Sequence, residues 1–395
     1  MPKLNRILSI IVLAQFCCTS LWFASNAVIN DIVLEFSLSE NALGYLTSAI
    51  QFGFIVGTLT FAVFNISDRF SPSKVFFISA IFGAFFNLGI LWSENTLISL
   101  MMLRFFTGFS LAGIYPVGMK IATDYFEKGL GKSLSFLVGA LVLGTAFPHL
   151  LNQFSDNFSW DLVIEGTSAL ATIGGILILI LVSDGPFRKK SKKIDFTSFF
   201  TIFKSQKFHS VAFGYFGHMW ELYAFWTFVP LMIKYYSQQT NSNLNVSLLS
   251  FIIIGLGSIA CVIGGYLSEK VTIKKTVLIA LVSSGICCLF SPLVYHYLST
   301  VWFLAFLAFW GMVVIMDSPL LSTLVAKNAD PAKKGTALTI VNCLGYSITI
   351  ISIQIINQLL NVTEVNNVFM ILAIGPILGV IALLKNNKKK SYQIQ

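Results

Sequence analysis

Charged side chains are scarce in this sequence. Only 11% of the 395 residues are Asp, Glu, Lys or Arg, whereas soluble domains contain about 25%. Hydrophobic residues make up 56% of the chain, and the mean hydropathy is +0.80. A chain of this composition cannot have water as its only solvent.

The sequence also lacks the short motifs of enzymatic and metal chemistry. Neither H-E-x-x-H nor G-x-S-x-G occurs, and no C-x-x-C pair is present. All six cysteines lie within apolar runs, so we expect them to pack in the interior. We therefore expect no cofactor and no metal site. The basic start of the chain is followed by no A-x-A cleavage site, so we interpret it as the beginning of a first membrane helix.

Long apolar runs recur along the whole chain. Runs of about 17 to 25 residues can cross a hydrocarbon core of about 30 Å as helices. These runs are apolar at odd and even positions alike, which excludes the alternation of a membrane barrel. The sequence predicts an all-α polytopic membrane protein with twelve transmembrane helices, at about residues 7–29, 42–64, 75–93, 97–119, 133–151, 162–182, 208–233, 247–268, 276–294, 300–326, 336–360 and 366–384.

Basic residues are concentrated on one side of the predicted spans. Of the 26 Lys and Arg residues, all but Lys234 and the intramembrane Arg104 fall at the termini or in the even-numbered connections. By the positive-inside rule that side is the cytoplasm, so we expect a multi-pass protein of the cell (inner) membrane with both termini cytoplasmic. The net charge of +9 reflects this topology and does not indicate nucleic-acid binding.

A basic interval divides the chain almost evenly. We expect an N-terminal six-helix bundle in residues 1–183, a cytoplasmic linker in 184–207, and a C-terminal six-helix bundle with a short basic tail in 208–395. The two halves contain matching segments. FNISDRFSPSK (residues 64–74) aligns with GYLSEKVTIKK (265–275), and FTGFSLAGIYP (106–116) aligns with FWGMVVIMDSP (309–319). Parallel repeats related by a pseudo-two-fold axis are typical of secondary transporters.

The loop after the second span and the sequence RFFTG in the fourth span resemble motifs of the major facilitator superfamily. The resemblance covers essentially the full length and implies alternating-access transport, with a cavity lined by spans one, four, seven and ten. It also implies a gating role for the loop residues and for their counterparts in the second half. The predicted gating residues are Asp68, Arg69, Lys74, Glu269 and Lys270.

Few ionisable residues lie inside the predicted spans. Each costs at least about 2.5 to 3.5 kcal/mol in the bilayer centre, so each needs a partner, a cavity or a function. The clear cases are Arg104, His218, Glu221 and Asp317, accompanied by the uncharged Gln15. Helical spacing places aromatic side chains on the same faces. The predicted substrate-binding residues are Gln15, Trp22, Arg104, Tyr115, Tyr215, His218, Phe225, Trp310 and Asp317, and the predicted proton-coupling residues are Glu221, His218 and Asp317.

Structural alternatives remain open for each charged residue. Arg104 could form an ion pair that holds the first half together, and Glu221 could be its partner. His218 could bond a backbone carbonyl, while Asp317 could lie close enough to the cytoplasmic end to be solvated. The sequence alone does not separate these roles from substrate or proton binding.

The predicted function is secondary active transport of a small organic solute across the cytoplasmic membrane, with protons as the coupling ion. A multidrug or metabolite exporter of the same fold is the alternative, and an intramembrane enzyme or receptor is a remote one. The expected partners are the solute, protons and the lipid bilayer, and we expect a monomer.

Overall fold

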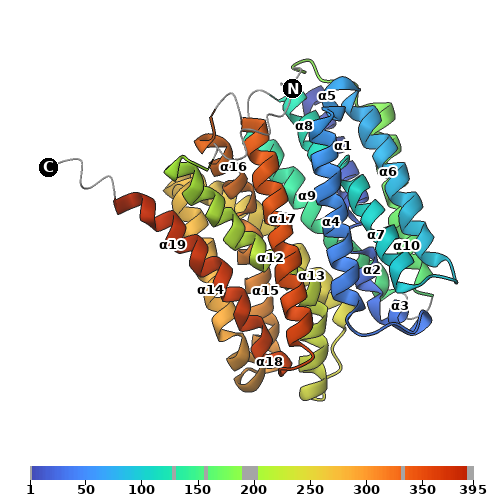
Figure 1. The fold of residues 1–395 in the computed structure, drawn as a ribbon, viewed down its shortest axis with the longest axis vertical. Helices are drawn as coiled ribbons and strands as arrows, with labels where there is room; N and C mark the ends of the chain where they lie inside the picture. Colours follow the sequence, from blue (N-terminus) through green and yellow to red (C-terminus); the bar gives the residue numbers. More distant parts are fainter. Residues whose placement is uncertain (1, 127–129, 155–158, 189–202, 331–333, 389–395) are drawn as a thin grey trace. The chain divides into compact units, whose positions relative to one another are not determined.

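The computed structural model describes residues 2–126, 130–154, 159–188, 203–330 and 334–388. Residues 189–202 of the predicted linker and most of the basic tail lie outside this part of the chain. No strand occurs in the described ranges, and the predicted all-α polytopic architecture is confirmed. The elements shown in Figure 1 are α1 (Pro2–Thr19), α2 (Ala24–Ala27), α3 (Ile29–Glu35), α4 (Ala42–Val63), α5 (Ile66–Arg69), α6 (Pro72–Leu88), η1 (Gly89–Leu91), α7 (Leu97–Leu111), α8 (Tyr115–Tyr125), α9 (Leu130–Gln153), α10 (Asp161–Leu181), α12 (Gln206–Gln239), α13 (Val246–Val271), α14 (Ile273–Tyr297), α15 (Thr300–Met316), α16 (Ser318–Asn328), α17 (Lys334–Leu359), α18 (Val365–Val368), η4 (Phe369–Ala373) and α19 (Ile374–Lys388).

Ten helical segments of the described chain are long and apolar enough to cross a membrane. They correspond to ten of the twelve predicted spans. The other two are the first and the seventh. The first predicted span is divided among α1, α2 and α3, and the seventh lies within α12, whose mean hydropathy is lowered by polar and tyrosine side chains.

The chain forms two compact units. One contains Met1–Lys193 and Asn243–Ser258, and the other contains Ile194–Ser242 and Ile259–Gln395. Helix α13 therefore begins in the first unit and ends in the second. The predicted boundary at residues 184–207 stays a prediction.

The fourth and tenth predicted spans are interrupted at matching positions. Helix α7 ends at Leu111 and α8 begins at Tyr115, directly before Pro116. Helix α15 ends at Met316 and α16 begins at Ser318, directly before Pro319. A proline lacks the N–H that would continue the helical hydrogen bonding, so each span restarts at its proline.

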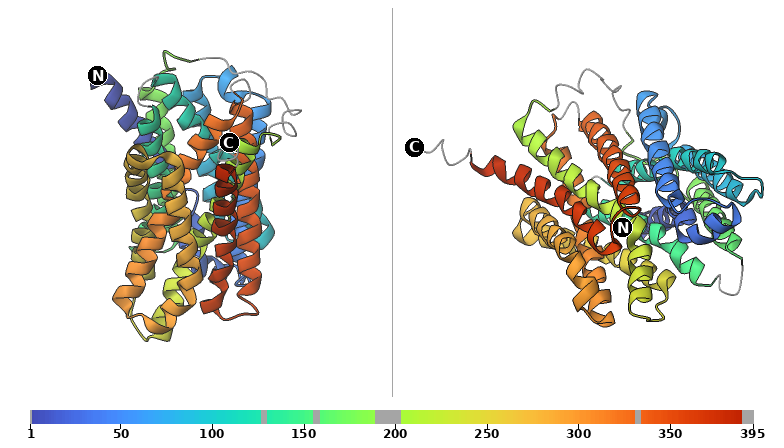
Figure 2. Two further views of the ribbon diagram at one scale, coloured as in Figure 1. Left: turned by 90° about the vertical axis from the view of Figure 1, so that its left-hand side faces the viewer. Right: turned by 60° about the horizontal axis from the view of Figure 1, so that its bottom comes forward.

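Small residues bring particular helices into backbone contact within each unit. In the first unit α4 lies along α7, and a Cβ on Gly53 would overlap the carbonyl oxygen of Phe105. In the second unit α12 lies between α17 and α19 (Figures 1 and 2). Here a Cβ on Gly217 would overlap the carbonyl oxygen of Gly375, and a Cβ on Gly375 would overlap that of Gly217. Close approach at small residues is how membrane helices gain packing energy in lipid.

Candidate functional site

The carboxylate of Glu221 lies inside the second unit and is fully hydrogen-bonded. The residue is 1% exposed. The Oγ of Ser284 donates to Oε2 at 2.8 Å, while Nε1 of Trp310 and Sγ of Cys288 donate to Oε1 at 2.6 and 3.3 Å. Three donors from α14 and α15 therefore stabilise a carboxylate of α12 in the interior, where burial of an unpaired charge would be unfavourable.

His218 and Asp317 form a second buried pair in the same unit. Nδ1 of His218 lies 2.8 Å from Oδ1 of Asp317, and both side chains are 1% exposed. Asp317 lies at the junction of α15 and α16, so the interrupted tenth span brings its carboxylate to α12. The pair lies within ion-pair distance without meeting hydrogen-bond geometry. Nε2 of His218 and Oδ2 of Asp317 have no hydrogen-bond partner among the described residues.

The predicted aromatic residues of the second unit surround these groups. The rings of Phe225 and Trp310 pack with their centroids 4.7 Å apart. The ring of Tyr215 lies 6.2 Å from that of His218, and its hydroxyl donates to Oδ1 of Asn342 at 2.7 Å. All six predicted site residues of this unit thus lie in two neighbouring clusters, linked along α12 by the three-residue spacing of His218 and Glu221.

Arg104 is fully buried in the first unit. Nη1 donates to the backbone carbonyl of Leu21 at 3.1 Å and to Oδ1 of Asn87 at 3.3 Å, and Nη2 donates to the carbonyl of Trp22. Those carbonyls belong to the break between α1 and α2, where helical hydrogen bonding is interrupted. The Nε atom of Arg104 has no partner among the described residues. Nδ2 of Asn87 donates to Oγ1 of Thr167 at 3.1 Å, and this hydrogen bond connects the surroundings of Arg104 to α10.

The other predicted residues of the first unit differ in their surroundings. Gln15 is fully buried, and both of its amide atoms lack a hydrogen-bond partner in the described chain. Its Oε1 lies against Gly118, where a Cβ would overlap it. Trp22 packs on Phe54 with ring centroids 4.9 Å apart. Tyr115 is partly buried at the first position of α8.

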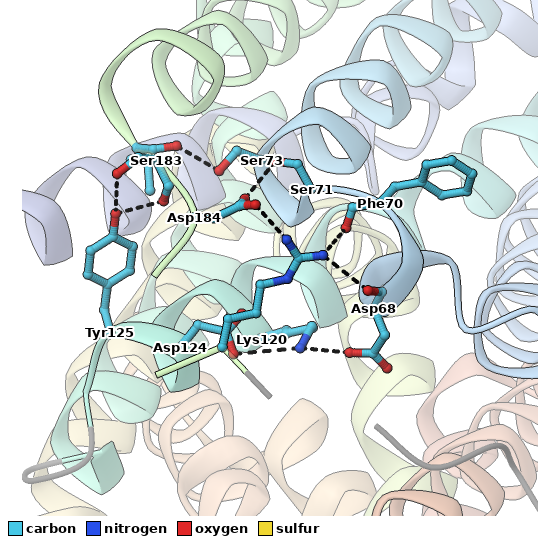
Figure 3. A network of polar contacts seen from close by, with 11 residues as sticks. Asp68, Phe70, Ser71, Ser73, Lys120, Asp124, Tyr125, Ser183 and Asp184 are labelled. Atoms are coloured by element: carbon cyan, nitrogen blue, oxygen red, sulfur yellow. Dashed lines mark hydrogen bonds and ion pairs between the residues drawn. The ribbon is translucent and has the colours of Figure 1, made fainter. Parts of the chain in front are cut away.

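The loop after α4 joins a network of charges (Figure 3). Nζ of Lys120 lies 2.8 Å from Oδ1 of Asp68 and 3.6 Å from Oδ1 of Asp124. Lys120 and Asp124 are one turn apart on α8, so the ion pair ties the loop to the end of the fourth span. The side chains of Asp68 and Lys120 are 12% and 19% exposed, which limits solvent screening.

Arg188 extends this network to the chain segment that follows α10. Its Nη2 donates to the backbone carbonyls of Asp68 and Phe70 at 3.1 and 2.7 Å. Its Nη1 lies 2.6 Å from Oδ2 of Asp184, and Oδ1 of Asp184 accepts from Ser71 at 2.6 Å. The loop is therefore fastened through both its side chains and its backbone (Figure 3).

The remaining predicted gating residues are exposed. Arg69 and Lys74, and Glu269 and Lys270 at the matching place in the second half, have no ion pair among the described residues. The acid-base pattern is repeated in the two loops of the sequence, whereas among the described residues the network of ion pairs involves the first copy.

Sequence reasoning missed the neutral residues that hold the charged ones, because such residues are common in membrane helices. The four-residue spacing of Ser284 and Cys288, which places them on one helical face, was the available signal for the Glu221 contacts. Asn87 had no comparable signal. The positive-inside pattern includes Lys120 and Arg188 and does not distinguish them from the other basic residues.

The long apolar helices define a multi-pass membrane protein. The chain belongs to the Major Facilitator Superfamily, whose sequence model matches residues 11–353. Membership of this family indicates a transporter rather than an enzyme.

Two curated relatives match part of the chain. The first is the "Probable galactarate/D-glucarate transporter GudP" of Bacillus subtilis (strain 168), 25% identical over 182 residues, which are 43% of this chain and 39% of that protein. The second is an "Uncharacterized transporter" of Buchnera aphidicola subsp. Baizongia pistaciae (strain Bp), 26% identical over 180 residues, or 43% and 42% of the two chains. The matched segments span about two fifths of each relative.

Solved structures share the fold over nearly the whole chain. A variant of the nucleoside transporter NupG matches with a TM-score of 0.74 and 15% identity, covering 97% of this chain and 99% of that one. A bacterial homologue of the human lysosomal transporter Spinster, inward-facing and unoccupied, matches with a TM-score of 0.68 and 14% identity, covering 97% and 95%. Identities this low establish the fold alone.

Proposed function

We propose that this protein is a secondary active transporter that moves a small organic solute by alternating access and is driven by protons. The observation that carries the proposal is the buried His218–Asp317 pair, which keeps two polar atoms without partners among the described residues. In a structural ion pair the remaining nitrogen and oxygen would be hydrogen-bonded, because an unpaired buried polar atom costs stability. Atoms left unpaired inside a transporter are suited to bind a proton or part of a solute.

Proton coupling requires that protonation changes the balance between conformations. An imidazole and a carboxylate 2.8 Å apart carry a net charge that changes when either gains a proton. Glu221 is three residues from His218 on α12, and Tyr215 also faces the imidazole. His218, Asp317 and Glu221 together form the proposed proton-coupling group.

The proposed solute-contacting residues are the predicted set on both units. Arg104, whose described hydrogen bonds go to neutral oxygens, suits a solute with an acidic group. The relative named for galactarate and D-glucarate makes these two diacids the first solutes to test. Export of drugs or metabolites remains the alternative direction. On the basis of the charge distribution, the protein lies in the inner membrane with both termini cytoplasmic. A monomer is part of the same proposal.

The test uses the purified protein in proteoliposomes with an imposed pH gradient. Wild-type protein should accumulate a solute only when the gradient is present. His218→Gln should retain exchange between equal pools and lose at least 10-fold in gradient-driven accumulation. His209→Gln changes an exposed histidine of the same helix and should behave like wild type. Full accumulation by His218→Gln would remove this residue from the coupling mechanism, and accumulation without any gradient dependence would overturn the proposed function.

A further inference from the structure

One face of α4 presents polar side chains to the interrupted first span. Thr47, Gln51 and Phe54 are spaced by four and three residues, so they lie on the same side of the helix. Nδ2 of Asn26 donates to Oγ1 of Thr47 at 2.8 Å, and the ring of Trp22 packs on that of Phe54 at 4.9 Å. Gln51 is therefore positioned on α4 between two contacts with the segment around α2.

Gln51 is fully buried, yet both of its amide atoms lack a hydrogen-bond partner in the described part of the chain. Oδ1 of Asn26 and Oγ of Ser25 are also buried and unpaired among these residues. None of the three residues is ionisable. Unpaired buried amides destabilise a folded protein, so we expect a group outside the described residues to complete these hydrogen bonds.

The unpaired atoms limit the chemistry of the group that can complete these hydrogen bonds. Oδ1 of Asn26 and Oε1 of Gln51 accept hydrogen bonds, Nε2 of Gln51 donates them, and Oγ of Ser25 can do either. A carboxylate satisfies only the donors, and an ammonium satisfies only the acceptors. An alcohol satisfies both, because its O–H donates and its oxygen accepts.

We propose that Gln51, Asn26 and Ser25 form a subsite for the hydroxyl groups of the transported solute, which is therefore a polyhydroxylated compound. This inference rests on the proposed transport function and adds the class of substrate to it. Trp22 and Phe54 supply an adjoining apolar surface for the carbon skeleton of such a solute. Gln51 is the residue that determines the preference for hydroxyl groups, because neither Nε2 nor Oε1 of its amide has a hydrogen-bond partner among the described residues.

The experiment compares solutes that differ only in hydroxyl groups. D-Glucarate and galactarate are paired with adipate, which has the same chain length and two carboxylates, and D-gluconate is paired with hexanoate. Binding is measured on purified full-length protein by thermal stabilisation and by competition. The wild type should bind a hydroxylated member at least 10-fold more tightly than its unhydroxylated partner.

Substitutions at two positions of α4, Gln51 and Thr58, separate recognition from stability. Gln51→Leu should reduce the preference for the hydroxylated member by at least 10-fold while raising the thermal stability of the solute-free protein. If the Gln51→Leu variant does not fold, Gln51→Ala should show the same loss of preference. Thr58→Val removes another unpaired buried oxygen on the same helix and should leave the preference unchanged.

The outcomes are distinguishable. A wild type without a preference for hydroxylated solutes, or a Gln51→Leu variant that keeps it, would overturn the inference and leave proton-driven transport untouched. If Gln51→Leu gains stability and keeps its preference, the amide is merely hydrated, and the subsite is refuted. Preferential binding of a hydroxylated solute without gradient-driven uptake would support the subsite and count against the proposed function.

Discussion

Two substitutions of Glu221 test whether its carboxylate exchanges a proton or serves only as a structural hydrogen-bond acceptor. In Glu221→Leu, Nε1 of Trp310 and Sγ of Cys288 lose their acceptor, whereas Oγ of Ser284 can still donate to the carbonyl of Leu281 at 3.3 Å. Each stranded buried donor costs about 1 to 3 kcal/mol, with the thiol at the low end, so the total loss is about 2 to 4 kcal/mol. We expect the unfolding equilibrium to shift by at least about 30-fold.

Glu221→Gln keeps most of these contacts. Its carbonyl oxygen can still accept from Trp310 and Cys288, and its NH₂ group can donate to the hydroxyl oxygen of Ser284. The expected loss is about 1 kcal/mol. The variant cannot gain or lose a proton, so we expect it to exchange solute between equal pools and to fail in accumulation against a gradient.

The assay combines reversible unfolding in detergent with counterflow and gradient-driven uptake in proteoliposomes. Equal stability of Glu221→Leu and wild type would show that the three contacts do not hold the carboxylate. Undiminished accumulation by Glu221→Gln would show that Glu221 does not couple transport to protons. If Glu221→Gln loses stability as severely as Glu221→Leu, the carboxylate is a structural element and the coupling argument fails.

Two further predictions concern the cytoplasmic loop and the topology. Asp68→Asn removes the ion pair with Lys120, which is partly exposed and contributes about 1 kcal/mol, so exchange measured by counterflow should slow several-fold while solute affinity stays within a few-fold. Collapse of affinity with a normal exchange rate would mean that this loop does not act as a gate. For the topology, a membrane-impermeant thiol reagent added outside should label Ser242→Cys and not Ser191→Cys, whose position lies outside the described residues. The six native cysteines are buried and give a low background. Labelling of both variants from the same side would refute the predicted orientation.

The helical spans could be predicted because lipid demands long apolar segments, and ten of the predicted spans are helical segments that meet that demand. The break after α1 could not be predicted in the same way, since Thr19 to Phe23 contains no proline or glycine. It is accompanied by a tertiary interaction, in which Arg104 takes up the carbonyls of Leu21 and Trp22. The local sequence around the break does not indicate that Arg104, more than eighty residues away, binds these carbonyls.

The candidate site shows the same division. Helical spacing correctly placed His218 and Glu221 as near neighbours on α12. The pairing of His218 with Asp317 depends on how α12 meets the interrupted tenth span, which periodicity does not describe. The unpaired amide of Gln51 could not be predicted from the sequence, because the hydrogen-bond partners of a glutamine in an apolar run depend on neighbours that only the fold specifies.

The reciprocal glycine contact between α12 and α19 has a consequence for biosynthesis. Gly217 lies in the seventh predicted span and Gly375 in the twelfth, so the two surfaces enter the membrane at the beginning and the end of synthesis of the second half. During the insertion of the intervening helices, the glycine face of α12 is without the partner it has in the folded protein. The second unit can therefore complete its packing only after the last helix has left the ribosome and inserted. Insertion of the final span is the step that completes its assembly.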